Sequence, residues 1–246
     1  MLSKCKEEDF DQIKSVALDR LSPNNISGAS WGFFIYGLVT TIVSFASIDS
    51  DVSLFMALLI TGSILLFVIQ LVFTLLFTIK TVAYKFQKLH SVFLSFIGFK
   101  LSVDTYQSFF GISESFNSPR YIFYAGVILL IGGIISLILS TFRSIKRVKQ
   151  GELRREGKGL YDFQNSKGFV SVPIIFGVTM LGGAAGRIFS DISSDITVLI
   201  ILFIAVILQY GIALALPEFY LLTYCKFRFD SFKVKRPDSR MRGSKR

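Results

Sequence analysis

The sequence predicts an all-α, polytopic integral membrane protein: a bundle of about six transmembrane helices with both termini in the cytoplasm. Three observations support this class. Of the 246 residues, 52% are hydrophobic, and the mean hydropathy is +0.57. Runs of roughly 18 to 26 apolar residues separate the charged clusters, and about 20 helical residues cross the hydrocarbon core of a bilayer. Lys and Arg follow these runs, as they do in cytoplasmic loops.

The net charge of +10 indicates which partners the chain can have. A basic stripe on a soluble fold would point to nucleic acid. Here the basic residues lie next to apolar runs, where attraction to anionic lipid headgroups accounts for them. We therefore expect the lipid bilayer as a partner, together with a protein partner or a second copy of the chain, and no nucleic acid.

The N-terminal region, residues 1–29, is predicted to be a cytoplasmic amphipathic segment with one short helix over residues 3–21. The apolar residues of its helical pattern are three and four apart: Phe10, Ile13, Ala17 and Leu21. Pro23 ends the pattern. The helix begins with several acidic residues, which suit its positive end but disfavour anionic lipid. Packing against a cytoplasmic loop or a partner is expected instead.

The apolar runs divide the chain into two membrane halves. The first half, residues 30–142, contains predicted spans near residues 31–48, 54–79, 89–105 and 121–142. The second half, residues 169–216, contains predicted spans near residues 169–186 and 196–216. A basic cytoplasmic loop, residues 143–168, separates the halves, and a basic cytoplasmic tail, residues 217–246, follows them.

The third span, residues 89–105, is required by charge rather than by hydropathy. If the basic segments after the second, fourth and last spans are all cytoplasmic, one further crossing must lie between the first two segments. Only residues 89–111 remain to supply it. The alternative is a re-entrant or interfacial segment that does not cross.

Lys100 and Asp104 lie in this weak span, four residues apart, so a helix places them on one face. An ionisable side chain at the bilayer centre costs about 2.5–3.5 kcal/mol on insertion scales, and it indicates a functional site. A pair facing the bundle interior would bind an ion or relay protons. In the alternative interpretation, Lys100 extends to the outer surface and Asp104 lies in water.

Two amide side chains stand inside strongly apolar spans, Gln70 in the second and Gln209 in the last. Such amides hydrogen-bond between helices or line a permeation path, and the first role is the more common.

The fifth span contains the residues expected to act in helix packing or as a hinge: Pro173, Gly177, Gly182 and Gly186. A bent or interrupted helix at this position would place backbone groups at a substrate, as in transporters.

Catalytic patterns are nearly absent. His90 has no second His or carboxylate at metal-binding spacing, and Cys5 and Cys225 match no CxxC pattern. No nucleophile with an activating partner is evident, so we expect no enzyme activity, no metal and no cofactor. The favoured function is a non-enzymatic accessory or interaction subunit, or a toxin-immunity type factor, in a bacterial plasma membrane. The alternative is a small transporter or channel with a path near the fifth span and Lys100/Asp104.

Overall fold

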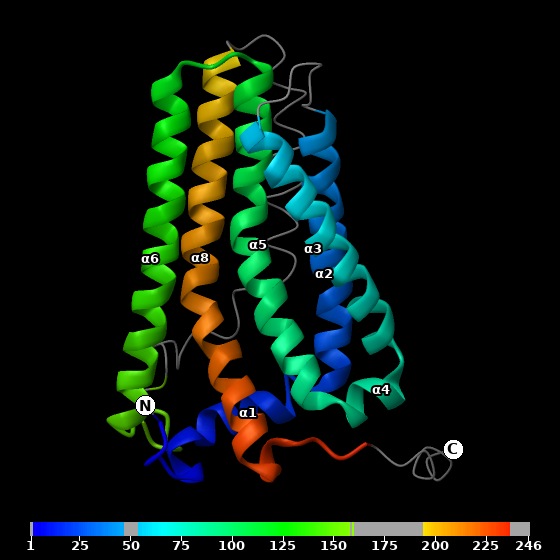
Figure 1. Cartoon of the computed structure of the whole chain (residues 1–246). Coiled ribbons are helices and arrows are strands. Elements are labelled where there is room, and N and C mark those ends of the chain that lie inside the picture. The colour runs from blue at the N-terminus through cyan, green and yellow to red at the C-terminus, as the bar shows by residue number, and fades with distance from the viewer. Residues whose placement is uncertain (1, 47–53, 158, 160–193, 237–246) are drawn as a thin grey trace, which may run out of the picture.

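The computed structural model describes residues 2–46, 54–157, 159 and 194–236, and every regular element in these ranges is a helix. The α-helices are α1 (Asp11–Leu18), α2 (Pro23–Ala46), α3 (Leu54–Thr78), α4 (Lys80–Lys85), α5 (Gln87–Ser115), α6 (Arg120–Lys149) and α8 (Ser194–Arg228). The 3-10 helices are η1 (Glu7–Phe10) and η3 (Asp230–Phe232). Figure 1 shows the five long helices side by side, with α1 and α4 at one end of the bundle. The predicted all-α fold is confirmed for these residues.

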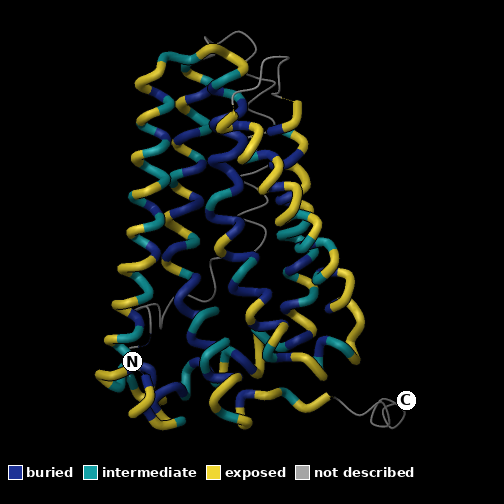
Figure 2. The backbone as a smooth tube through the Cα atoms, viewed as in Figure 1, coloured by how far each residue is buried: buried dark blue, intermediate teal, exposed yellow. Residues whose placement is uncertain are grey.

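Four of the described helices are long and apolar enough to cross a membrane: α2, α3, α6 and α8 from Asp195 onward. Their surfaces carry large exposed apolar side chains such as Leu54, Leu65 and Ile128. Figure 2 shows exposed residues along the outer faces of α3 and α6. Such continuous apolar surface is unfavourable in water and matches lipid tails. The chain is therefore a multi-pass membrane protein in a lipid bilayer.

Several helices extend beyond the predicted spans. Pro23 ends the N-terminal pattern and is also the first residue of α2. Proline suits this position, because a backbone N–H there would have no acceptor within the helix. The predicted loop at residues 143–168 begins as helix, because α6 continues to Lys149. The predicted tail at residues 217–246 also begins as helix, because α8 continues through Pro217. Basic residues in the last turns of α6 and α8 favour these extensions, since cations stabilise a helix C-terminus.

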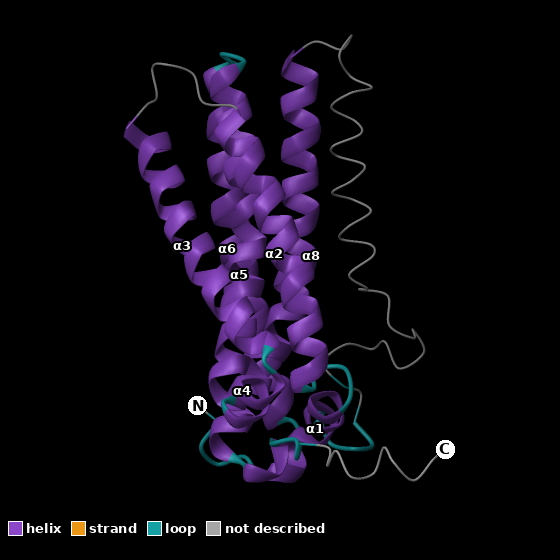
Figure 3. Ribbon diagram, turned by 90° about the vertical axis from the view of Figure 1, so that its right-hand side faces the viewer, coloured by secondary structure: helices purple, strands orange, loops and turns teal. Residues whose placement is uncertain are grey.

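Residues 89–105, predicted as a weak third span, belong to α5, which is the central helix of the bundle. α5 has 29 residues, which corresponds to a length of about 43 Å. It packs against α2 and α3 on one side and against α6 and α8 on the other. Figures 1 and 3 show α2 and α5 running in one direction and α3, α6 and α8 in the other. Although α5 is too polar to be among the four candidate spans, 20 of its residues are buried.

Glycine allows α5 and α6 to approach closely, which gives a testable prediction. A Cβ atom at Gly126 of α6 would lie 2.1 Å from Cε1 of Phe109, a ring with no exposed surface on α5. We expect Gly126→Ala to lower the free energy of unfolding by about 1–3 kcal/mol through overpacking. The control is Gly62→Ala in α3, where no atom lies within 4 Å of the added Cβ. Thermal unfolding in detergent checks this, and equal melting temperatures for the two variants would contradict it.

The end of the bundle that carries α1 is closed by segments distant in sequence. We call this structure the cap: residues 2–6, η1, α1, the last turn of α6, the turn at residues 150–157, the end of α8 from Leu221 onward, and η3. Its buried apolar residues form one cluster, which includes Leu2, Phe10, Ile13, Ala17, Val148, Leu153, Leu221, Leu222, Cys225 and Phe232. The single helix expected over residues 3–21 is in fact η1 followed by α1, which ends at Leu18.

Hydrogen bonds fix the N-terminal segment to both of its neighbours in the cap. The backbone amide of Gln12 donates to the carbonyl of Leu153 at 3.1 Å. The guanidinium of Arg228 donates to the carbonyl of Leu2 at 2.6 Å. The N-terminal segment thus packs against the loop after α6 and against the end of α8, in agreement with its predicted packing against a loop.

A carboxylate in the cap makes its closure dependent on pH. Burial alone would raise the pKa of Asp9, but the hydrogen bond from the Lys6 amide and the guanidinium of Arg154, 2.8 Å away, outweigh it and lower this pKa below 3.8. The stabilisation is therefore present above pH 3.8 and is lost as the pH falls through the lowered pKa. A spin label at Leu18→Cys is expected to become mobile over that acidic range. The same label combined with Asp9→Asn should show a much smaller change, and an identical profile would contradict the assignment.

Candidate functional site

The candidate site lies inside the bundle where α2, α3 and α5 meet. Lys100 Nζ is 2.6 Å from Asp104 Oδ2, and the two side chains are 3% and 9% exposed. Lys100 therefore lies in the interior and does not extend to the outer surface. The (i, i+4) spacing on α5 produces the contact directly.

Gly37 of α2 provides the space for this ion pair. A Cβ atom at Gly37 would lie 3.2 Å from Lys100 Nζ, 3.2 Å from Gln70 Oε1 and 3.7 Å from Asp104 Oδ2. Polar atoms from α3 and α5 thus meet at the bare backbone of α2. The ring of Phe67 lies 5.9 Å from Lys100 Nζ and adds a cation–π contact. We call Gly37, Gln70, Lys100 and Asp104 the central site.

The central site contains an acceptor that is not satisfied. Gln70 is 1% exposed, and its Oε1 has no hydrogen-bond partner in the described part of the chain. Ser63 and Thr74 lie on the same face of α3, and their hydroxyl oxygens are also buried without a partner. A buried polar group without a hydrogen bond carries a cost of about 1–3 kcal/mol. This face of α3 therefore offers oxygen atoms to a water, a proton or a cation.

Hydroxyl groups continue the polar interface between α2 and α5 away from the cap. The hydroxyls of Tyr36 and Thr105 are hydrogen-bonded to each other. Ser108 donates to the carbonyl of Thr40 at 3.2 Å and lies 3.5 Å from the hydroxyl of Ser44. In a membrane bundle each polar group must find its partner inside the protein, and these hydroxyls find theirs in one another and in a backbone carbonyl. The row extends the polar environment of the central site along α5.

Gln209, the other amide predicted to be a path-lining or interhelical residue, lies elsewhere. Its Nε2 donates to the carbonyl of Leu130 at 3.1 Å, and its side chain lies against Gly133 of α6. A Cβ at Gly133 would lie 1.8 Å from Gln209 Oε1, so the glycine is required for this contact. Gln209 thus joins α8 to α6 and does not contribute to the central site.

The remaining predicted site residues, Pro173, Gly177, Gly182 and Gly186, lie outside the described residues. Among the residues that the structure does describe, no group of three or more metal-ligating side chains occurs. Cys5 and Cys225 are free and buried in the cap. Sequence analysis did not identify Gly37. The absence of a side chain at this position of α2 leaves the space that the Lys100 and Asp104 side chains occupy.

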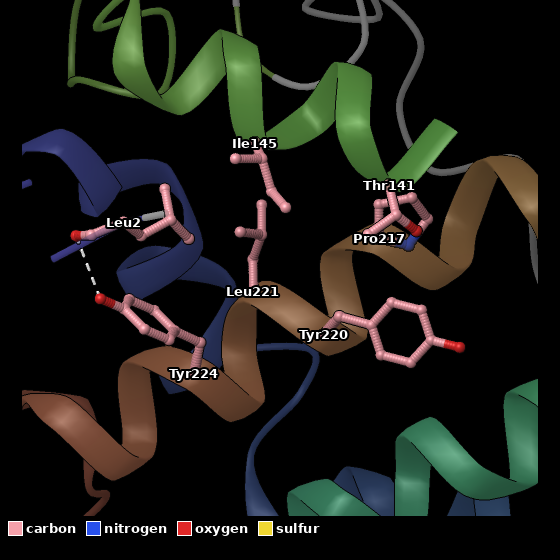
Figure 4. A pocket seen from close by; sticks show the side chains of 7 residues that line it. All are labelled: Leu2, Thr141, Ile145, Pro217, Tyr220, Leu221 and Tyr224. Atoms are coloured by element: carbon pink, nitrogen blue, oxygen red, sulfur yellow. Dashed lines mark hydrogen bonds between the residues drawn. The ribbon is translucent and has the colours of Figure 1, made fainter. Parts of the chain in front are cut away.

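A small cavity lies at the cap end of α6 and α8, separate from the central site. Its volume is about 180 Å³, and it is lined by Leu2, Thr141, Ile145, Pro217, Tyr220, Leu221 and Tyr224 (Figure 4). The hydroxyl of Tyr224 donates to the carbonyl of Leu2 at 3.1 Å and closes one side. The surface that lines the cavity is almost entirely apolar.

The central site is thus a buried ion pair, an unsatisfied amide oxygen and a row of hydroxyls on the inner faces of three helices. This arrangement can hold a proton or a small cation, and it can also specify the packing of α5. Comparison of the chain with protein-family models, with curated proteins and with solved structures gives no match.

Proposed function

We propose that this chain is a small transporter or channel for protons or a small cation, with Lys100, Asp104 and Gln70 at its centre. The observation that supports the proposal is the buried Lys100–Asp104 pair beside the unsatisfied oxygen of Gln70. Moving either charge to the bilayer centre costs about 2.5–3.5 kcal/mol on insertion scales. An apolar helix would pack the bundle without this cost, so the polar groups of α5 call for a functional role.

The proposed topology has six crossings, with the cap and both termini in the cytoplasm of a bacterial cell. The support for this orientation is the distribution of basic residues. Lys85, Lys146 and Arg228 all lie at the cap end of their helices, as the positive-inside tendency requires. A membrane-impermeant thiol reagent should therefore label Glu114→Cys from outside intact cells and Lys85→Cys only after lysis. The opposite pattern would reverse the orientation.

Transport is tested with the purified protein in liposomes. Separate dyes for protons, Na⁺ and K⁺ follow flux down an imposed gradient. We expect a flux for at least one of these ions, and a loss of more than tenfold in Asp104→Asn and in Gln70→Leu. Asp19→Asn is the matched control, because Asp19 is exposed outside the long helices. Absence of flux for all three ions, in protein shown to be folded, would contradict the proposal.

The second candidate function is that of a non-enzymatic accessory subunit or immunity-type factor that binds a protein partner or another copy of this chain. The cap supports it, because three segments distant in sequence pack into one folded unit there. A photo-crosslinker at the exposed Arg155 should then yield a defined product in intact membranes. The charge reversal Lys149→Glu, six residues earlier at the end of α6, is expected to reduce that product. If no product forms at any cap position, this candidate is excluded.

A further inference from the structure

A second buried polar cluster lies at the cap end of the bundle, between α5 and α8. His90 of α5 and Lys226 of α8 both have no exposed surface. In the described part of the chain, the two imidazole nitrogens of His90 and the Nζ of Lys226 have no hydrogen-bond partner. The turns that carry them are joined, because the hydroxyl of Thr223, three residues before Lys226, donates to the carbonyl of Ser91, the residue after His90. Two basic groups are thus enclosed together.

Neighbouring contacts hold these two side chains in place. One turn away, the hydroxyl of Thr223 on α8 donates to the carbonyl of Ser91 on α5 at 2.9 Å. The ring of Phe77 stacks on the His90 imidazole, with the ring centroids 4.1 Å apart and the planes inclined by 16°. The cluster is therefore part of a packed interface and not a solvated end of the bundle.

No carboxylate in the described part of the chain forms an ion pair or a hydrogen bond with Lys226. Helices α2, α3 and α4 contain no acidic residue. Nearby carboxylates of the cap and of α8 are already paired: Glu7 with Lys14, Glu218 with Arg20, and Asp230 with Lys233. On α5, Asp104 is paired with Lys100 and lies about 21 Å along the helix from His90. The other acids of α5 and α8, Glu114 and Asp195, lie at the opposite end of the bundle.

We propose that His90 and Lys226 bind a small inorganic anion of the size of chloride. A buried ammonium without a counter-ion is strongly unfavourable, and an anion between the two side chains would accept hydrogen bonds from both. Because both residues are fully enclosed, the site suits a monatomic anion rather than a lipid phosphate. The site shares no residue with the central site, so it stands independently of the proposed transport.

The experiment compares thermal unfolding of the purified protein in sodium chloride and in sodium gluconate at equal ionic strength. We expect chloride, at ten times its Kd, to raise the Tm of the wild-type protein by about 3–6 °C. The shift should follow a logarithmic binding curve, whereas a general salt effect increases in proportion to concentration. Lys226→Met should abolish the chloride-dependent shift. Lys85→Met is the matched control, since Lys85 is exposed at the same end of the bundle and its replacement should leave the shift intact.

Two results would overturn the proposal: a wild-type Tm that is the same in both salts, or a chloride response that persists unchanged in Lys226→Met. If Lys226→Met does not fold, the anion series of the wild-type protein decides. A Tm that rises with the logarithm of the chloride and of the bromide concentration, without an effect of gluconate, supports the site. A response that is equal for all three anions contradicts it.

Discussion

Lys100→Ala and Asp104→Ala are each expected to lower the free energy of unfolding by about 3–5 kcal/mol. Each change leaves the other charge buried and unpaired, because the Lys100 and Asp104 side chains are 3% and 9% exposed and bond to each other at 2.6 Å. The loss of stability in each variant reflects the burial of the remaining unpaired charge and does not measure the strength of the Lys100–Asp104 contact. Unfolding by heat or denaturant in detergent measures it.

The double variant Lys100→Met with Asp104→Leu separates the cost of an unpaired charge from simple loss of packing. Replacing both members of a buried ion pair by apolar residues of similar size is often neutral or stabilising. We therefore expect the double variant to be more stable than Lys100→Met alone or Asp104→Leu alone, and these three variants to give a coupling energy of about 0.5–3 kcal/mol or more. Additive losses would mean that the two side chains are not coupled. The double variant should nevertheless show no flux if the central site carries transport.

Phe10→Ala is expected to release the cap from the bundle. Phe10 has no exposed surface and contacts the rings of Tyr224 and Phe229, with centroids 5.9 Å away in each case. Truncation of a buried Phe costs about 3–5 kcal/mol. Because the cap is a small unit at the end of a large bundle, the loss should appear first as local opening. Hydrogen exchange of the α1 amides is the measurement.

Leu18→Ala is the control for this prediction, because Leu18 is the last residue of α1 and is 50% exposed. Its α1 amides should exchange at nearly the wild-type rate. Amides of α5 should remain protected in both variants, since the bundle does not depend on Phe10. Equal exchange of α1 in the two variants would show that the cap is not held by this ring.

Hydropathy predicted the apolar helices well, because an apolar run of 20 residues or more is stable in very few settings besides a lipid bilayer. The predicted span at residues 54–79 and helix α3, Leu54–Thr78, agree within one residue. The ends of α6 and α8 were missed for a physical reason. The last turns of these helices bury apolar residues in the cap but also carry several Lys and Arg residues, and hydropathy interprets such charged stretches as loop.

The central site was predicted only in part. The spacing of Lys100 and Asp104 indicates a shared face on any helix, so their contact could be expected. Which residues surround them depends on how three helices pack. Gln70 is far away in sequence, and Gly37 contributes only the absence of a side chain. His90 and Lys226 could not be paired from the sequence either, because they lie on helices far apart in the chain and only the packing of α5 against α8 brings them together.

The polarity of α5 has a consequence for biogenesis. Because α5 is not among the helices apolar enough to cross a membrane by composition, it gains little from contact with lipid tails on its own. Its 20 buried residues are covered by helices made both before it and after it, α2 and α3 on one side and α6 and α8 on the other. Synthesis therefore passes through a stage in which α5 has only half of its protein surroundings. At that stage Lys100 and Asp104 already face α2 and α3, and the face of α5 that later packs against α6 and α8 depends on the insertion machinery for shelter until α8 is made.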